Sequence, residues 1–527
     1  MSTKEHPDNG LRAKLGSILP KDRQFTIFHL STPPTKSAAL YSAPPNQRPD
    51  RTFCESHFLA VSVKTPDEHG AAAADEEPKN VLVFGVEVLL YSTMHTTTLF
   101  VSKADSTGYL NLLRLPKGTP SPIREVCGAF LSHLVENRRR KDKQFIVSLF
   151  ARAQSQYLFP GSVKNSGKHI LDDRGLVKWW CRVLSPLLET PPEGDLAPWA
   201  SVKGYLVVPG LDEYETRAFL PRAQLPSWSL THPLERISHY TKEFDSVPPR
   251  CLIPRYPDDP KSRFRDELDE EAAQSGGMRK AGTWKSAKTL DLFWEMMAFR
   301  QECSSGRLTG FIWVVFDDDA AESGGPRTGS DTPRRAGPPA QSATAASTRT
   351  QVKTKKKKAK KLRGVIITRP PRIKTEQKNY MLARCPVSTP HYVWPTGGRG
   401  ERVVAEGAYR RIVELLLHLD FATLDKAAGS TRRWVSEVAM GSAWGYDVTG
   451  TMEVPAAVTE NGDGAVNNLS GFVKRKRAAA DATEPAGDAG VTTLSAGLVR
   501  KKNKPEAPEE APVQVLSAGL VRKKQKA

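Results

Sequence analysis

Two segments with few large apolar side chains limit how much of the 527-residue chain can fold. From Asp317 to Gln351 the sequence is mostly Gly, Pro, Ser, Thr, Ala and Arg, and after Met452 it is rich in Ala, Gly, Glu and Lys. Such compositions bury too little apolar surface to offset the entropy lost on ordering. The expected parts are one folded core split into residues 1–316 and 362–452, a disordered insertion at 317–361 and a disordered basic tail at 453–527.

These two segments contain the densest clusters of basic residues. Lys and Arg outnumber Asp and Glu by 77 to 58, which predicts attraction to nucleic acid, phosphorylated cofactors or acidic proteins. Lys353–Arg363 is typical of a nuclear-import or polyanion-binding stretch, and Lys474–Arg477 is another basic cluster. The tail carries LSAGLVRKK twice, at 494–502 and 516–524. Each copy resembles a docking motif for an acidic partner; a solvated linker end and an inert tail remain the alternatives.

The spacing of the cysteines and the length of the apolar runs indicate in which cellular compartment the protein works. The six cysteines lie far apart with no CxxC pair, which argues against both a zinc site and a disulfide framework. The first residues contain no apolar signal region, and no apolar run approaches the roughly 18 residues of a membrane helix. We therefore expect an intracellular protein with no membrane partner and no metal.

Apolar periodicity indicates interleaved strands and helices. β-branched and aromatic runs predict strands, three of them in a β-meander, at 57–63, 81–92, 96–105 and 145–153. Spacing of 3 to 4 residues predicts helices at 122–137, 172–189 and 402–420, with Ser121 as a cap and an end or kink near Pro186. The expected fold class is α/β (α+β): a central mixed β-sheet surrounded by helices.

Phosphate-binding signatures are incomplete. GSVKNSGKH at 161–169 has five residues between its glycines, and His169 stands where a P-loop needs Ser or Thr, so we reject a Walker A site. No GxGxxG, HExxH or GxSxG motif occurs. Lys164 and Lys168 in this loop, and Arg114 and Lys117 before the predicted helix at 122, suit phosphate binding with modest specificity, although each alone is more often a surface residue on a turn.

The segment YPDDPKSRF at 256–264 permits two interpretations. Asp259 can cap a helix whose first residue is Pro260, or Asp258 and Asp259 can face a cationic substrate. Deprotonating a lysine at pH 7 costs roughly 4.6 kcal/mol, because its ordinary pKa lies about 3.4 units higher. Since a helix dipole favours the anionic carboxylate, we expect Asp259 to be a weak base that orients the lysine.

Several blocks together resemble the fungal histone H3 acetyltransferases of the regulator of Ty transposition family. They are FVSKAD at 100–105 with Gly108 and Tyr109, SQYLFP at 155–160, KNSGKHIL at 164–171, KWW at 178–180, PDDPKSRF at 257–264 and FRQE at 299–302. Their order and spacing agree with that family. The resemblance implies a central mixed sheet wrapped by helices, similar to the CBP-type acetyltransferases.

The resemblance also implies site residues. Asp259 matches the proposed catalytic aspartate, Asp258 its neighbour, and Lys261 a buried lysine that becomes autoacetylated; Asp105 and Trp180 match residues that line the active site. The positions implied for acetyl-CoA are Ala104, Asp105, Ser106, Arg114, Lys117, Phe150, Arg152, Gln154, His169, Ile170, Leu171 and Trp179. Because tandem helical residues point about 100° apart, we expect at most one of Trp179 and Trp180 to pack in the core, with paired core tryptophans as the alternative.

The function implied is acetyl transfer from acetyl-CoA to a core lysine of histone H3 near the DNA entry edge and to tail lysines. Histone H3–H4 and chaperones of the NAP and anti-silencing types are the implied partners, in the nucleus, during chromatin assembly, DNA replication and the DNA damage response. Direct DNA binding is not required. The alternative is a non-catalytic, basic chromatin or nucleic-acid-binding protein.

Overall fold

The computed structural model describes residues 9–65, 79–189, 198–274, 284–300, 307–318, 385–439 and 442–455. These residues all belong to one compact unit, Met1–Val458. The expected insertion beyond Asp318, both copies of LSAGLVRKK and the basic clusters at 353–363 and 474–477 lie outside the described residues. Asp317 itself is the last residue of a strand, so the ordered part continues beyond the expected boundary at 316.

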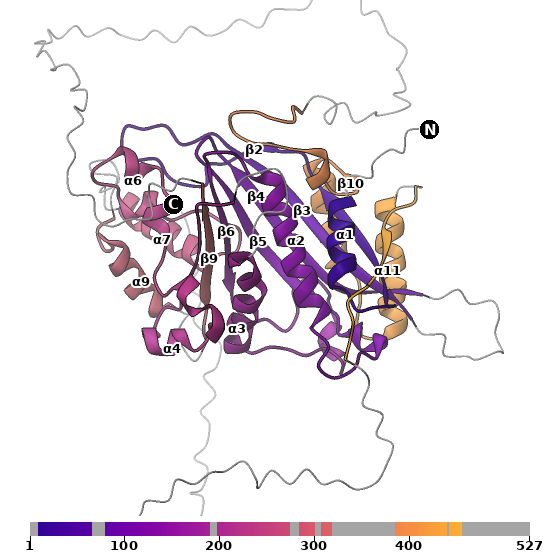
Figure 1. Cartoon of the computed structure of the whole chain (residues 1–527). Coiled ribbons are helices and arrows are strands. Elements are labelled where there is room, and N and C mark those ends of the chain that lie inside the picture. Colours follow the sequence, from indigo (N-terminus) through magenta and orange to yellow (C-terminus); the bar gives the residue numbers. More distant parts are fainter. Residues whose placement is uncertain are drawn as a thin grey trace, which may run out of the picture. The chain divides into compact units, whose positions relative to one another are not determined.

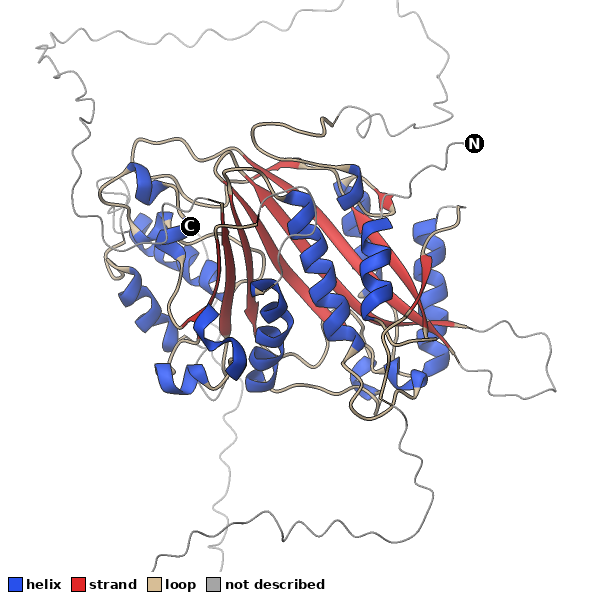
Figure 2. Cartoon of the chain, viewed as in Figure 1, coloured by secondary structure: helices blue, strands red, loops and turns tan. Residues whose placement is uncertain are grey.

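An 11-stranded mixed sheet forms the centre of the described part, in the order β10-β1-β3-β4-β5-β6-β9-β7-β8, with β11 on β1 and β2 on β3 (Figure 2). The strands are β1 (Gln24–Ser31), β2 (Thr35–Ser37), β3 (Thr52–Lys64), β4 (Asn80–Ser92), β5 (Thr96–Ser106), β6 (Gln144–Ala151), β7 (Ser201–Val207), β8 (Trp228–Ser229), β9 (Gly310–Asp317), β10 (Arg402–Val403) and β11 (Tyr446–Thr449). The meander β3-β4-β5 is antiparallel, as the sequence predicts, whereas β5 and β6 run parallel.

Helices cover both faces of this sheet. They are α1 (Asn9–Ile18), α2 (Pro122–Arg138), α3 (Asp173–Leu184), α4 (Glu213–Arg217), α5 (Leu234–Ile237), α6 (Tyr240–Glu243), α7 (Pro260–Gln274), α9 (Leu290–Ala298), α10 (Glu406–Leu416) and α11 (Leu424–Ala439). Figure 1 shows α1, α2 and α3 side by side in front of the strands. None of the helices in the described part is long and apolar enough to cross a membrane.

Strand alternation decides which helix packs on which face. His29 and His57 contact Phe130 of α2, whereas Phe28 and Phe58 on the other face contact Trp434 of α11. Further along the sheet, alternate residues of β6 and β9 face either α3 or the cluster formed with α7 and α9. The expected fold class, a central mixed sheet surrounded by helices, is confirmed.

Some predicted boundaries need correction. The C-terminal helix begins at Glu406 rather than Arg402, because Arg402 and Val403 extend to pair with β1. The helix at 172–189 ends at Leu184, and Ser185–Leu188 continues as a 3-10 turn around Pro186. Ser121 precedes α2 as predicted, but its side chain makes no capping hydrogen bond.

Candidate active site

A cavity of about 790 Å³ opens where β5 and β6 separate. Their parallel pairing ends at Phe100 and Ser148, yet β5 continues to Ser106 and β6 to Ala151. The space between the diverging carboxyl ends is walled by residues of α2 and α3. A crevice at the carboxyl ends of parallel strands is a common ligand site, and this volume lies in the usual range for such sites.

Most residues implied for acetyl-CoA line this cavity. They are Ala104, Asp105, Ser106, Arg114, Phe150, Arg152, Gln154, His169, Ile170, Leu171 and Trp179. Trp180 lines it as well, whereas Lys117, Asp258, Asp259 and Lys261 are not among the lining residues. The structure therefore brings together residues that lie up to 76 positions apart between Ala104 and Trp180.

Asp105 fixes the cavity's inner loop. One carboxylate oxygen accepts hydrogen bonds from the backbone N–H groups of Tyr157, Leu158 and Phe159, at 2.7, 2.9 and 3.3 Å. The other oxygen accepts from Lys168 Nζ at 2.8 Å, and the two side chains are 8% and 4% exposed. Because its oxygens accept several charge-assisted bonds, Asp105 holds the loop in place.

The neighbouring loop is shaped by glycine. Gly108 has φ of 92°, and a Cβ there would lie 2.5 Å from the backbone nitrogen of Lys168. Only glycine adopts this conformation and leaves room for so close an approach. Lys168 lines the cavity, and its ammonium group is paired with Asp105, whereas Lys164 in the same loop is exposed.

The paired tryptophans form one wall. Their rings meet edge to face with centroids 4.8 Å apart. Trp180 is 5% exposed and packs in the core, while Trp179 is only partly buried. The prediction that only one ring is a core residue is confirmed, although both line the cavity.

Arginines that the sequence reasoning missed complete the lining. Arg124, in the first turn of α2, and Arg182, one turn after Trp179 on α3, join Arg114 and Arg152. The spacing of three residues between Trp179 and Arg182 was an available signal, because such residues share a helix face. Arg124 donates two hydrogen bonds to the Glu125 carboxylate, so the positive lining suited to phosphates comes chiefly from Arg114, Arg152 and Arg182.

Asp259 and Lys261 form a buried ion pair on the other face of the sheet. Both side chains are fully buried, and the Asp259 carboxylate also accepts from the backbone N–H of Lys261 at 3.0 Å, so it caps α7 as predicted. Asp258 is exposed, with φ of 57°. The alternative prediction, two carboxylates open together to a substrate, is wrong for Asp259.

Aromatic rings separate this pair from the cavity. Lys261 Nζ lies 5.0 Å from the ring centroid of Tyr256 and 5.2 Å from that of Phe311. The Tyr256 ring stacks on Phe100 at 4.2 Å, and Phe100 stacks on Phe150, which lines the cavity. The buried pair thus supports the cavity wall from behind.

Burial changes both protonation equilibria of the pair. It raises the pKa of the Asp259 carboxyl above its usual value, although Lys261 acts in the opposite direction, and it lowers the pKa of the Lys261 ammonium. The expected low pKa from the helix dipole is therefore wrong in direction, because desolvation of a fully buried carboxylate outweighs it. Both shifts have the same cause, the loss of water around each charge, and the attraction between the two partners opposes both of them.

Comparisons with known proteins agree with this geometry. The family model of the histone acetyltransferase KAT11-type domain matches residues 11–146 and 140–437. Histone acetyltransferase rtt109 of Aspergillus flavus is 38% identical over 542 residues, which is 93% of this chain and 88% of that protein. Histone acetyltransferase rtt109 of Schizosaccharomyces pombe is 32% identical over 305 residues, 56% of this chain and 68% of that protein. The crystal structure of Rtt109 from Aspergillus fumigatus matches with a TM-score of 0.64 and 39% identity, covering 84% of this chain and 100% of that one.

The fold, the cavity and these matches define an acetyltransferase enzyme. More narrowly, the chain belongs to the KAT11-type histone acetyltransferase family. The resemblance to the regulator of Ty transposition family is confirmed.

Acetyl-CoA, the acetyl donor implied by this family, fits the residues present. Apolar side chains such as Ile123, Leu149 and Leu176 suit its pantetheine arm, and the arginines suit its phosphates. When bound, acetyl-CoA supplies the thioester carbonyl that the amine attacks.

Proposed function

We propose that this enzyme acetylates lysines of histone H3: a core lysine near the DNA entry edge of the nucleosome and several tail lysines. The observation that carries the proposal is the cavity in this KAT11-type fold. Trp179 and Trp180 form one of its walls, and Asp105, which holds the inner loop, lines it as well. The names of the similar fungal enzymes, histone acetyltransferases, support histone as the substrate. A non-catalytic, basic chromatin or nucleic-acid-binding protein is disfavoured, because nucleic-acid binding would not require this cavity.

In this proposal the acetyl group passes directly from acetyl-CoA to the neutral amine of the substrate lysine, within the cavity. Of the described lining residues, Asp105 is the only carboxylate, and Lys168 and backbone N–H groups already occupy its oxygens. Asp259 is buried beyond the aromatic wall. We therefore assign loss of the lysine proton to solvent. The tryptophan wall then excludes water from the neutral amine as it attacks the thioester.

Lys261 is assigned as an autoacetylation site. Burial lowers the pKa of its ammonium, which favours the nucleophilic neutral amine. Mass spectrometry of the enzyme after incubation with acetyl-CoA tests this assignment. Acetylation at Lys261 supports it, and an unmodified Lys261 in active enzyme contradicts it.

Histone chaperones of the NAP and anti-silencing types present H3–H4 in this proposal. The enzyme acts in the nucleus, during chromatin assembly, replication and the DNA damage response. Support comes from the basic stretch Lys353–Arg363 and from the repeated LSAGLVRKK segments, whose charge suits import and docking on acidic partners. Recovery of chaperones with the full chain and with a chain ending at residue 493 tests docking; equal recovery contradicts it.

The test of the proposal uses H3–H4, acetyl-CoA and the full chain, with and without each chaperone type, followed by mass spectrometry of the histones. We expect acetyl groups on H3 lysines and a faster rate with chaperone. Acetylation of H4 alone, or of neither histone, overturns the substrate assignment. An unchanged rate with both chaperones overturns their role. Salt-sensitive DNA binding that is lost on deleting Lys353–Lys361, without acetyl transfer, favours the alternative protein class.

A further inference from the structure

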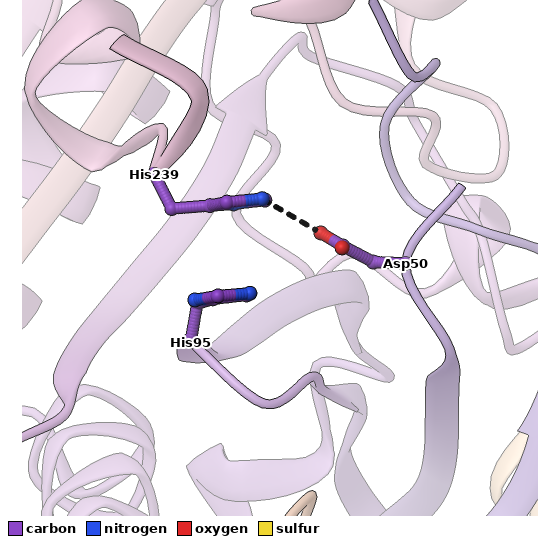
Figure 3. A group of neighbouring side chains, drawn as sticks. All are labelled: Asp50, His95 and His239. Carbon is purple, nitrogen blue, oxygen red and sulfur yellow. Dashed lines mark ion pairs between the residues drawn. The ribbon is translucent and has the colours of Figure 1, made fainter. Parts of the chain in front are cut away.

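Three side chains with metal-ligating atoms, none of which lines the cavity, lie close together (Figure 3). Asp50 comes from the segment before β3, His95 from the turn between β4 and β5, and His239 from the connection between α5 and α6. One ligating atom from each lies within 4.8 Å of the other two. All three residues are partly buried.

The distances suit a metal better than a direct hydrogen bond. His239 Nε2 and Asp50 Oδ2 are 3.5 Å apart, beyond the usual hydrogen-bond range. Ligands bound at 2.0–2.2 Å in a tetrahedron lie about 3.4 Å from each other, so this pair already has the required separation. The rings of His95 and His239 are parallel, 3.9 Å apart, so His95 must tilt for both nitrogens to meet one ion.

The surroundings leave room for such an ion and its water. A cavity of about 170 Å³ borders both His95 and His239. The buried hydroxyl of Tyr240, whose ring contacts His239, has no hydrogen-bond partner among the described residues. A metal-bound water is one group that could satisfy it.

Charges around the cluster are mixed. Lys242 and Glu243 of α6 act on His239 in opposite directions, and Asp50 opposes His95.

We propose that Asp50, His95 and His239 bind one Zn²⁺ ion, with water completing the tetrahedron. Two imidazoles and a carboxylate are a common zinc ligand set. The prediction of no metal came from cysteine spacing, which cannot reveal ligands drawn from three separate segments. The ion would act as a structural clip for the segment before β3.

That segment also supports α7. The carbonyl of Leu40 accepts a hydrogen bond from Arg255 N at 2.8 Å, and Ser42 accepts one from Arg265 of α7. Leu40 and Tyr41 pack with Tyr256, the ring beside Lys261. Zinc at Asp50 would therefore stabilise the support of the Asp259–Lys261 pair without taking part in acetyl transfer.

The test is dialysis of the chelator-treated full chain against Zn²⁺ alone, with bound metal measured by mass spectrometry. His95→Ala is the main variant, because His95 lies in a turn and its loss should leave the fold intact. His418→Ala, which removes an exposed histidine just after α10, is the matched control. We expect the wild type and His418→Ala to hold one zinc more than His95→Ala and His239→Ala.

Two further measurements distinguish zinc bound at the Asp50, His95 and His239 site from zinc bound loosely at the surface. Co²⁺ should give the strong visible bands of tetrahedral coordination in the wild type, and these should be absent in His95→Ala. Zn²⁺ should raise the melting temperature of the wild type and of His418→Ala but not of His95→Ala. Equal zinc content in the wild type and a folded His95→Ala, or an unchanged cobalt spectrum, overturns the proposal.

Discussion

Lys261 and Asp259 form an ion pair in which both side chains are completely buried, on the opposite side of an aromatic wall from the cavity. In a buried pair of this kind each charge stabilises the other, because either charge alone in the interior would lower the free energy of unfolding. The ion pair explains why the segment at 256–264 both caps α7 and supports the wall of the cavity. Asp259 therefore affects the cavity indirectly, by holding Lys261 against the aromatic rings that form the wall.

The first prediction concerns breaking this pair. Lys261→Met leaves a carboxylate buried without its partner, so the free energy of unfolding should fall by about 3–5 kcal/mol. Denaturant unfolding measures the change. The double variant Lys261→Met with Asp259→Asn should recover part of the loss, because no charge remains buried and Asn still caps α7.

A matched control is the exposed pair Lys64 and Asp447, whose atoms are 3.9 Å apart. Lys64→Met should change the free energy of unfolding by at most about 1 kcal/mol. A loss at Lys261 no larger than the loss at Lys64 contradicts the account of the buried pair.

The second prediction concerns the Asp105 clamp. Asp105→Ala removes the acceptor of the Tyr157, Leu158 and Phe159 N–H groups and leaves the Lys168 ammonium without a carboxylate, with only the Ser162 hydroxyl as acceptor. We expect a lower free energy of unfolding and a raised KM for acetyl-CoA. Asp105→Ala combined with Lys168→Met should regain stability but not KM, because the loop stays unclamped. Wild-type KM in a folded Asp105→Ala enzyme would rule out the clamp.

The third prediction is a pH dependence of stability. Burial lowers the pKa of His57 to about 4, from an ordinary value of 6.5, despite the opposing effect of Glu55. Between pH 6.5 and 4 the unfolded chain therefore binds more protons at this residue. The free energy of unfolding should fall as pH decreases through that window, by up to about 1.4 kcal/mol per pH unit from His57 alone.

Denaturant unfolding of the wild type and His57→Gln from pH 7 to 4 measures this slope. The variant should show a shallower slope, by up to one proton. Glu55 contributes at lower pH: burial opposes ionisation, but Arg138 and His57 outweigh it and lower its pKa to about 2. Its stabilisation is lost between pH 4.5 and 2, which overlaps the window that tests His57 only between pH 4.5 and 4. Parallel slopes for the two proteins would refute the His57 assignment.

The fourth prediction concerns the arginines of the cavity. Arg182→Ala should raise KM for acetyl-CoA about tenfold, because it removes a cation from the phosphate-binding lining, with a smaller effect on kcat. The matched control is Arg410→Ala, an arginine of α10 that is 75% exposed and pairs with Glu406. A KM change that is equal in the two variants would argue against a role for Arg182 in binding.

Local elements could be predicted from the sequence because each depends on near neighbours. The β-branched runs of the meander, Pro122 at the start of α2 and Asp259 before Pro260 all carry their signals within a few residues. The C-terminal helix was predicted too long because the extended backbone of Arg402 and Val403 is decided by pairing with β1, a partner about 370 residues away.

The site depended on the family resemblance because its geometry is long-range. Nothing near Asp105 in the chain shows that it accepts N–H groups from Tyr157 to Phe159, and nothing near Asp259 shows that it is buried. The cavity itself exists because β5 and β6 diverge, which only the tertiary structure shows. Arg124 and Arg182 were missed because an arginine on a helix is usually a solvated residue.

The most direct measurement of the central claim is the initial rate of acetyl transfer to H3–H4 by the wild type, by Trp180→Ala and by His418→Ala, with each fold checked by circular dichroism. The account predicts transfer by the wild type and the control, and a rate at least 100-fold lower for Trp180→Ala, because the cavity wall that excludes water is lost. No transfer by the wild type, or a wild-type rate in folded Trp180→Ala, would contradict it.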